Sequence, residues 1–393
     1  MNLHRPAEGT AAEAKAAVEI RPVATRADRR AFLELPYRLY RGDPHWRPPL
    51  RAEAAALIGG PRTNPWFTHG RAQLFLARRG ERVVGRISAH VDDLVVARRP
   101  GLGQWGLFEC EDDPEAGACL LAHAEAWLRH QGMTRAEGPM SLSIWDEPGL
   151  LVSGHETAPV VMMGHHAPHL RRIVETAGYA KAKDLHAWRL PVANGFPEKV
   201  NRIVAAGERN PRIRVRKVDK ARFEAEARLI LGILNRAWAQ NWGFVPLTEA
   251  EVAHVGRKLK PIIYPDLVRV AELDGAPVAF MMTLPDVNEW TADLGGRLFP
   301  FGWAKLLLRI RRGRARFMRV PLMGVLPHLQ GTRMASLLAF MMIEHSRRAA
   351  VDRHGATHAE IGWILEDNGP MISIAEAIEA TIARTYRIYE KDL

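Results

Sequence analysis

A short polar turn, Gln330-Gly331-Thr332-Arg333, separates an apolar run from an apolar-faced segment. The apolar run at 317–325 is bounded by charge before it and by Pro327 after it, which predicts a β-strand. The segment from Met334 to Glu344 predicts a helix. A strand, a small turn and a helix start direct backbone N–H groups and the positive end of a helix at one spot, where a phosphate can bind. An ordinary structural link between a strand and a helix is the alternative.

A second stretch, residues 297–319, contains eight Arg or Lys residues and no acid. Aromatic residues such as Phe299, Phe301 and Trp303 alternate with the basic ones. A basic amphipathic segment of this kind is suited to an anionic membrane surface. A core-facing helix with a solvated basic edge is one alternative. A nucleic-acid stripe is another, but no recognised nucleic-acid motif accompanies it, so we expect no nucleic-acid partner.

Acids and histidines also gather in the first half of the chain, where a metal site has to be considered. The residues are Asp146, Glu147, His155, Glu156, His165, His166 and His169. Their spacing follows no recurring ligand pattern, so we expect no metal. We instead expect His155 and Glu156 to face a substrate across a domain interface.

The composition sets the broad class of protein. The 393 residues exceed one typical domain, and 47% hydrophobic with 25% charged residues is typical of globular proteins. A net charge of +11 favours an anionic partner, either a lipid headgroup, a nucleic acid or a phosphorylated cofactor. Cys110 and Cys119 form no disulfide framework. No signal-peptide core and no run near the roughly 20 apolar residues of a membrane span are present, so we expect a cytoplasmic protein, at most peripheral on the inner membrane.

The order of predicted elements occurs twice, which indicates an old duplication. A helix, a tryptophan loop and a hairpin follow one another at Trp46 and Gly80, and again at Trp242 and Gly275. Each half predicts a mixed α/β fold with a mostly antiparallel sheet flanked by helices. The predicted organisation is a flexible tail over 1–17, a first domain over 18–192, a linker over 193–211 and a second domain over 212–393.

These features resemble the GNAT superfamily of acyltransferases, whose pyrophosphate loop reads Q/R-x-x-G-x-G/A. Gln330 opens that pattern and Ala335 closes it, while Arg333 stands at the middle glycine. Longer segments are similar to tandem-GNAT bacterial ceramide synthases and their uncharacterised relatives, namely PHWRPP, GPMSLSIWDEPGLLVSGHE, NWGFVPLTEAE, GRLFPFGWAKLLL, VLPHLQG and TYRIYEKDL. The resemblance implies two tandem GNAT-like domains and an N-acyltransferase that moves a long-chain acyl group from acyl-CoA to a sphingoid-base amine.

The resemblance also implies where acyl-CoA binds, with the thioester along the strand and the pyrophosphate on the turn. The expected acyl-CoA residues are Gly324, Val325, Leu326, Gln330, Gly331, Thr332, Arg333, Met334, Ala335, Ser336 and Asn368. The matching turn of the first half contains the carboxylates of Glu109-Cys-Glu-Asp-Asp-Pro-Glu, which repel a pyrophosphate. We therefore expect a degenerate first domain and CoA binding in the second.

Acyl transfer to an amine requires a base that takes the amine proton. We expect Asp286 or Glu289, three residues apart at the end of a hairpin strand, to be that base. The usual acid tyrosine of the family is missing, because position 375 is alanine. Tyr386 or a bound water is expected to replace it, and Asn241 and Trp242 are expected to contact the substrate.

Two other functions remain open from the sequence. One is an acetyl-CoA-dependent N-acetyltransferase of a small amine or peptide. The other is a non-catalytic protein that senses CoA or binds a partner.

Overall fold

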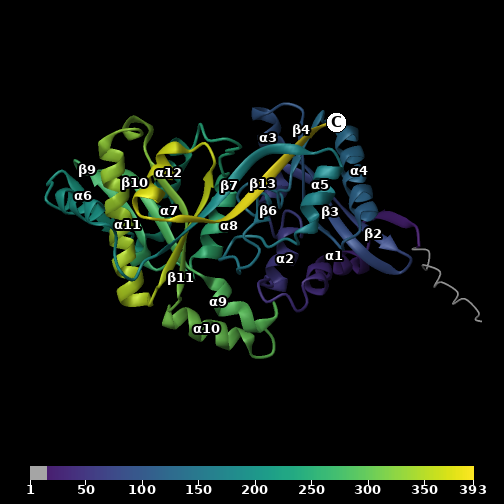
Figure 1. Ribbon diagram of the computed structural model, residues 1–393, viewed down its shortest axis with the longest axis horizontal. Coiled ribbons are helices and arrows are strands. Elements are labelled where there is room, and N and C mark those ends of the chain that lie inside the picture. The colour runs from purple at the N-terminus through teal and green to yellow at the C-terminus, as the bar shows by residue number, and fades with distance from the viewer. Residues whose placement is uncertain (1–15) are drawn as a thin grey trace, which may run out of the picture.

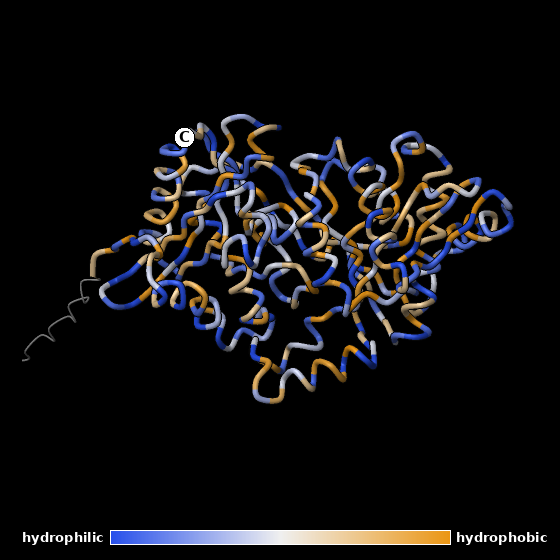
Figure 2. Tube along the Cα trace, turned by 180° about the vertical axis from the view of Figure 1, so that it is seen from behind, coloured by the Kyte–Doolittle hydropathy of each residue, from blue (hydrophilic) through white to orange (hydrophobic). Residues whose placement is uncertain are grey.

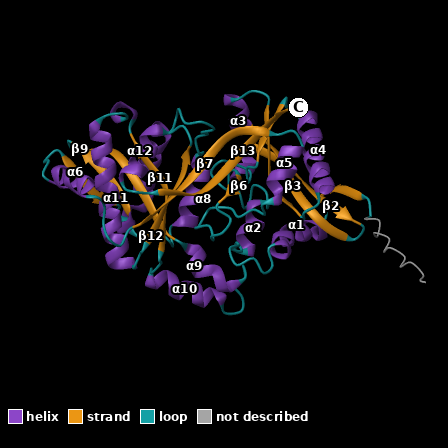
Figure 3. Cartoon of the chain, in the orientation of Figure 1, coloured by secondary structure: helices purple, strands orange, loops and turns teal. Residues whose placement is uncertain are grey.

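The computed structural model describes residues 16–393, which form one continuous sheet of 13 strands with helices packed around it (Figure 1, Figure 3). The tail predicted over 1–17 lies almost wholly outside the described residues. In the first half the elements are β1 (Val18–Pro22), α1 (Arg26–Leu39), α2 (Arg51–Leu57), β2 (Gly70–Arg79), β3 (Arg82–Asp92), α3 (Asp93–Arg98), β4 (Leu102–Cys110), α4 (Pro114–His130), β5 (Arg135–Gly138), β6 (Leu150–Ser153), α5 (His169–Thr176) and β7 (Ala180–Pro191).

The second half repeats this order with one additional helix at its start, with α9 and α10 where the first half has α3, and without a counterpart of β6. Its elements are α6 (Glu198–Glu208), β8 (Ile213–Lys217), α7 (Phe223–Ala237), α8 (Glu249–Leu259), β9 (Val268–Leu273), β10 (Ala276–Pro285), α9 (Val287–Thr291), α10 (Gly302–Arg312), β11 (Phe317–Val325), α11 (Arg333–His354), β12 (His358–Leu365), α12 (Gly369–Ala377) and β13 (Thr381–Asp392). Among the helices of residues 16–393, none is long and apolar enough to cross a membrane.

The centre of the sheet is shared between the two halves. The strand order is β1-β2-β3-β4-β5-β13-β7-β12-β11-β10-β9-β8, with β6 paired to β13. The strand that closes the first half, β7, therefore pairs with β12 of the second half. Strand β13 of the second half, in turn, lies between β5 and β7 of the first half. The halves are consequently joined by backbone hydrogen bonds rather than by side-chain packing alone.

In the first half, helices cover both faces of the sheet. Neighbouring residues of a strand point to opposite faces. Phe75 of β2 belongs to the core cluster that contains Leu120 of α4, whereas Leu76 packs with Phe32 of α1. Helices α4 and α1 therefore cover opposite faces of the same strands.

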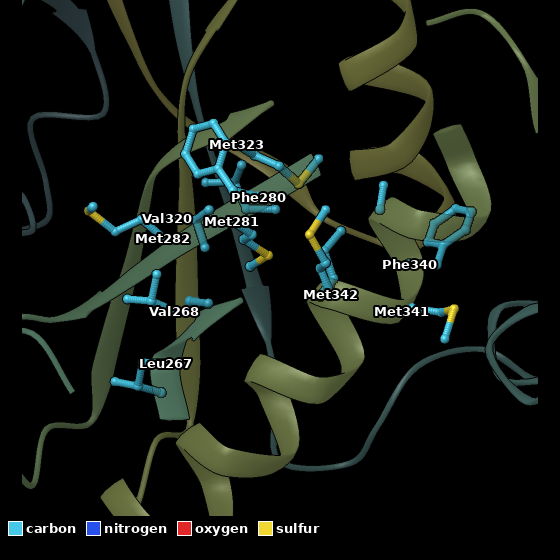
Figure 4. Close-up of a cluster of buried hydrophobic side chains, with 14 of the residues drawn as sticks. Leu267, Val268, Phe280, Met281, Met282, Val320, Met323, Phe340, Met341 and Met342 are labelled. Carbon is cyan, nitrogen blue, oxygen red and sulfur yellow. The ribbon is translucent and has the colours of Figure 1, made fainter. Parts of the chain in front are cut away.

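The core of the second half is rich in methionine. Met281 and Met282 of β10, Met323 of β11 and Met342 of α11 are all buried. Figure 4 shows Met342 on the side of α11 that faces the strands. Unbranched thioether side chains fill irregular gaps, which suits the junction between a sheet and a long helix.

The segment predicted as a linker, 193–211, contains the helix α6. Val200 and Val204 are buried on its inner face, and α6 packs against α11. The residues that suggested a linker, Ala193–Pro197 and Asn210-Pro211, lie before and after this helix.

A buried charge cluster links the three central strands. Glu360 of β12 accepts a bond of 2.6 Å from Arg384 of β13 and one of 2.7 Å from Arg189 of β7. Glu360 and Arg384 are fully buried, and Arg384 also donates to Thr157 of the first half. One carboxylate thus neutralises guanidinium groups from both halves of the chain.

We expect Glu360→Ala to lower the free energy of unfolding by about 3–5 kcal/mol, because it leaves the Arg384 guanidinium buried without a counter-charge. Urea denaturation followed by circular dichroism measures this loss. The control is Arg212→Ala, which breaks the exposed pair with Asp274 and is expected to cost no more than about 1 kcal/mol. Equal losses in both variants would contradict a structural role for the cluster.

Candidate active site

A cavity lies where β11 and β12 separate. The two strands pair in parallel as far as Val320 and Ile361, and beyond this pair they diverge. A cavity of about 770 Å³ occupies the gap. Strand residues in its wall include Val320, Pro321, Leu322, Met323, Ile361, Gly362 and Trp363.

Apolar side chains of two helices form another side of the cavity. From α7 they include Phe223, Ala227, Ile230, Leu231 and Leu234, and from α8 Val252, Val255 and Leu259. A cavity of this size with mostly apolar walls and a few polar groups is typical of small-molecule sites. Its walls suit an aliphatic chain better than a polar ligand.

The first half of the chain completes the cavity. Ala52, Ala56 and Leu57 of α2 line it, as does the loop from Ser143 to Asp146. In that loop, Trp145 stacks on Trp238 with ring centroids 6.0 Å apart and an interplanar angle of 7°. The Trp238 indole donates to the Met323 carbonyl at 2.9 Å. The two tryptophans therefore connect the first half to the diverging part of β11.

A buried cation lies at the base of the gap between the strands. Arg319, counted from the sequence with the basic surface segment, is 1% exposed and lines the cavity. It donates to the carbonyls of Val161 and Gly362, and its guanidinium lies 4.7 Å from the centre of the Trp363 ring. Burial lowers the pKa of Arg319 to about 10. The side chain stays charged at neutral pH and faces the gap from the sheet side.

Asp146 is a carboxylate in the cavity wall that forms no ion pair within residues 16–393. It accepts one bond of 2.9 Å, from the Ser143 hydroxyl. Burial raises the pKa of Asp146 to about 6, against the opposing effect of the Ser143 bond. By contrast, Glu226 pairs with Arg216, and Glu251 accepts bonds from the backbone and side chain of its helix cap.

The turn before α11 has the strand–turn–helix geometry expected from the sequence. Thr332 caps the helix and accepts from the Ala335 N–H, and Gly331 has a positive φ of 75°. The Gln330 side chain donates to the carbonyls of Ala237 and Val325, so it fixes the turn to α7 and β11. Within the described chain, the N–H groups of Gly331, Arg333 and Met334 have no acceptor. These exposed donors lie at the positive end of a 22-residue helix.

The strand end that leads into this turn is tightly packed. Gly324 allows α7 to approach β11, since an added Cβ there meets Ala237 at 3.1 Å. The Leu326 N–H donates to Val278 at 2.9 Å. Ser336 is exposed on the first turn of α11. Asn368 lines the cavity and caps α12 through its side chain.

Asp286 and Glu289, the carboxylates selected from the sequence, lie outside the cavity wall and bind backbone amides. Asp286 is 5% exposed and accepts from the Val161 N–H at 2.8 Å and from the Asn288 N–H at 3.1 Å. Glu289 accepts from the N–H groups that open β11. Burial raises the pKa of Asp286 to about 7.

The other residues selected from the sequence divide into two groups. Asn241 and Trp242 line the cavity. Tyr386 is buried behind Trp363, a cavity residue, and donates to the Gly164 carbonyl at 2.9 Å. His155 is half-buried and Glu156 is exposed, and both lie outside the cavity wall. Sequence reasoning missed Trp238, Arg319 and Trp363, whose signal was only their place in apolar runs.

The corresponding position of the first half is closed. The Met140 N–H donates to the Trp105 carbonyl at 2.8 Å, so the chain after β5 stays against β4. A Cβ on Gly106 would lie 1.5 Å from the Met140 carbonyl oxygen. The acidic turn between β4 and α4 is paired with arginines, Arg79 binding Asp113 and Glu115.

The chain is similar to two curated proteins over nearly its whole length. A bacterial ceramide synthase of Caulobacter vibrioides is 43% identical over 374 residues, which cover 95% of this chain and 97% of the relative. Protein YghO of Escherichia coli is 38% identical over 376 residues, 95% of each chain. No protein-family model matches the chain.

Solved structures confirm the predicted mixed α/β fold with two tandem GNAT domains. A tandem GNAT protein from the clavulanic acid biosynthesis pathway aligns with a TM-score of 0.56 at 13% identity, covering 96% of this chain and 98% of that one. A GCN5-related glucosamine N-acetyltransferase region of a fungal β-N-acetylglucosaminidase aligns with a TM-score of 0.55 at 14% identity, covering 96% of this chain and 38% of that one.

We expect Asp286→Asn to change the pH dependence of stability. The folded pKa of Asp286, about 7, lies above its ordinary value of 3.8, so its favourable contribution is full at low pH and is lost as the pH rises through 7. The Asn side chain keeps an acceptor for Val161 and carries no charge. Between pH 5 and 8 the variant should therefore gain about 2–3 kcal/mol relative to the unmodified chain.

Chemical denaturation at a series of pH values measures this difference. Asp286→Ala removes the acceptor as well and should be about 1–3 kcal/mol less stable than the Asn variant at every pH. If the unmodified chain and the Asn variant lost stability in parallel, Asp286 would not be the buried acid described above.

Proposed function

Because this chain belongs to the bacterial ceramide synthase family of tandem GNAT acyltransferases, we propose that it transfers a long-chain acyl group from acyl-CoA to the amine of a sphingoid base. The observation that carries this proposal is the cavity between β11 and β12. It begins where an acyl thioester has access to strand backbone and continues between the apolar faces of α7 and α8. Two aliphatic tails require such a volume, whereas an acetyl group does not.

The reaction forms a C–N bond and breaks a C–S bond. The amine nitrogen attacks the thioester carbonyl carbon, the tetrahedral intermediate expels the CoA thiolate, and the amide product remains. The amine loses one proton to a base, and the thiolate takes up one proton. Backbone N–H groups on the free side of β11 and the Arg319 charge are suited to stabilise the developing oxyanion.

We propose that CoA phosphates bind at the turn before α11. Gly331, Arg333 and Met334 offer backbone N–H donors there, and the Arg333 guanidinium is exposed beside them. Gln330, Thr332, Ala335 and Ser336 hold or border the turn, and Gly324, Val325 and Leu326 lead the strand into it. Asn368 in the cavity wall is the remaining member of this acyl-CoA set.

We propose that Asp146, rather than Asp286 or Glu289, is the base that takes the amine proton. Its carboxylate borders the cavity, and its pKa of about 6 leaves it ionised yet basic near neutral pH. Asp286, Glu289 and Tyr386 are proposed to position the site, since each binds the backbone around it. Asn241 and Trp242 are proposed to contact the amine substrate, and His155 and Glu156 to act on the interface between the halves.

The proposed division of labour follows the two halves. Residues 212–393 supply the acyl-CoA domain, and residues 18–192 supply a degenerate GNAT domain that closes the cavity. We also propose that the segment 297–319 touches an anionic membrane surface, which makes the protein peripheral on the cytoplasmic side of a membrane.

Thiol release from palmitoyl-CoA and from acetyl-CoA, each with and without a sphingoid amine, tests the proposed function. Amine-dependent release with the long-chain thioester alone, together with an N-acyl lipid found by mass spectrometry, is the expected result. Amine-dependent release with acetyl-CoA alone would replace the proposal with a small-substrate acetyltransferase. CoA binding without consumption of either thioester would indicate a sensor.

Filling the cavity should change the acyl chain length that is accepted. Gly256 of α8 lines the cavity, and a Cβ there has room, 3.5 Å from Phe223. We expect Gly256→Leu to lower kcat/KM for palmitoyl-CoA at least about tenfold and to spare a short acyl-CoA. Gly232→Leu on the exposed face of α7 is the matched control and should change neither.

Removing the proposed base should lower the rate of the chemical step. We expect Asp146→Asn to reduce kcat about 10²–10⁴-fold with little effect on the KM for acyl-CoA. In the unmodified enzyme kcat should fall below pH 6, where Asp146 is protonated, and the variant should lose this limb. His254→Gln tests whether His254, the histidine that lines the cavity, is the base instead. If that variant or Asp286→Asn removed the limb instead, Asp146 would not be the base.

A further inference from the structure

The loop before α10 and the outer side of α10 expose an unusual cluster of apolar side chains. Of the six large apolar residues exposed within the described chain, five lie between positions 299 and 308. They are Phe299 at 82% exposure, Phe301 at 74%, Trp303 at 51%, Leu308 at 49% and Leu307 at 41%. Single exposed apolar residues are common, but a contiguous cluster marks an interaction surface. Figure 2 shows this hydrophobic segment along the lower edge of the molecule.

All charged residues from Arg297 to Arg319, which include this apolar segment, are basic. Arg297, Lys305, Arg311 and Arg312 are exposed within or beside it. The acid Asp293 is already paired with Lys305 and Arg309. Apolar side chains surrounded by cations complement an anionic bilayer rather than a protein surface of mixed charge.

A basic groove of the first half lies next to this segment. It has a volume of about 260 Å³ between α1 and α2 and is bordered by Arg26, Arg29, Arg30 and Arg51. Three of these, on α1, have the spacing that places side chains on one face of a helix. Arg51 pairs with Glu34, while Arg26 and Arg30 are exposed and form no ion pair within residues 16–393.

Direct contacts join the groove to the apolar segment. The Arg51 N–H donates to the Gly296 carbonyl at 2.9 Å, and the Tyr37 hydroxyl donates to Pro49 at 2.7 Å. Gly296 has a φ of 74°, and an added Cβ would lie 2.6 Å from the Pro49 carbonyl. Gly296, three residues before Phe299, is thus packed against the wall of the groove.

Helix α2 separates the groove from the cavity. Its Arg51 and Ala54 border the groove, whereas Ala52, Ala56 and Leu57 line the cavity. None of its residues is fully buried, so it is a thin wall with a surface on each side.

We propose that the groove between α1 and α2 binds the phosphate of an anionic phospholipid headgroup, while the segment 299–308 inserts its apolar side chains into the same bilayer. The groove and the segment form one docking face, to which both halves of the chain contribute, and α2 connects this face to the cavity. The part of the inference that concerns the cavity rests on the proposed function, since a two-tailed reaction draws its substrates from a membrane.

Flotation with lipid vesicles tests the docking face, using the full chain and vesicles of phosphatidylcholine with or without phosphatidylglycerol. The unmodified chain should float with the anionic vesicles and should dissociate as salt is raised. Arg26→Gln/Arg30→Gln should weaken the binding on the order of 25-fold, because each basic residue at such a surface contributes a factor of about five. Phe299→Ser/Phe301→Ser/Trp303→Gln should abolish it at moderate salt.

The matched control is Arg202→Gln/Arg214→Gln, which removes the same charge from exposed positions on α6 and β8 at the other end of the sheet. It should retain most of the binding. If the control and the groove variant lost vesicle binding equally, the loss would reflect net charge alone, and the proposed groove site would be wrong. Absence of vesicle binding by the unmodified chain, or a dimer that the apolar variant dissolves, would overturn the docking face.

Activity separates this inference from the proposed function. With substrates in detergent micelles, the docking variants should keep the unmodified rate, and with substrates in anionic vesicles they should lose it in parallel with binding. Full activity on vesicles by a variant that no longer binds them would overturn the link to the cavity and leave the acyltransferase intact. An unmodified chain that binds vesicles but never consumes acyl-CoA would instead refute the proposed function.

Discussion

The fold depends on the pairing of β7 with β13, because each of these strands also extends the sheet of the other half. A pair of domains joined by a linker adjusts its relative orientation, but a continuous ladder of backbone hydrogen bonds does not. The carboxylate of Glu360, held between Arg189 and Arg384, fixes the register at this seam. The cavity inherits its shape from that register, since the first-half loop at Asp146 reaches β11 only when the seam is formed.

The duplicated halves have diverged in opposite directions. In the second half the two parallel strands separate and create space, and in the first half Gly106 lets the Met140 carbonyl close the same gap. Closing the first gap shapes the loop that follows β5, which contains Trp145 and Asp146. The copy that has lost its cleft thus provides a wall for the copy that kept it. Residues of both halves therefore line the same cavity.

The sequence predicted the local elements well where one periodicity dominates. The strand before Pro327, the helices α1 and α4, and both hairpins follow directly from apolar patterning and turn residues. Helix α6 was missed because its apolar face is narrow and flanked by polar residues and a proline. The shared central strands were missed because pairing between β7 and β13 joins residues that are far apart in the chain.

The candidate site was predictable only in part, for a related reason. A turn rich in small residues indicates a phosphate site because backbone N–H groups bind the phosphate. Gly331 and Thr332 could therefore be selected from the sequence directly. Carboxylates are different, because sequence position does not tell whether a side chain turns toward a cavity or toward backbone amides. The side chains of Asp286 and Glu289 bind backbone amides, while that of Asp146, from the other half, borders the cavity.

The position of β13 has a consequence for biosynthesis. Strand β13 emerges from the ribosome about 250 residues after β5, so the first half cannot complete its sheet until the second half has been synthesised. At roughly 5–20 residues per second, the edge of β5 waits on the order of tens of seconds for its partner. Throughout that interval the nascent chain presents an unpaired strand edge, a surface that can pair with another chain unless it is covered.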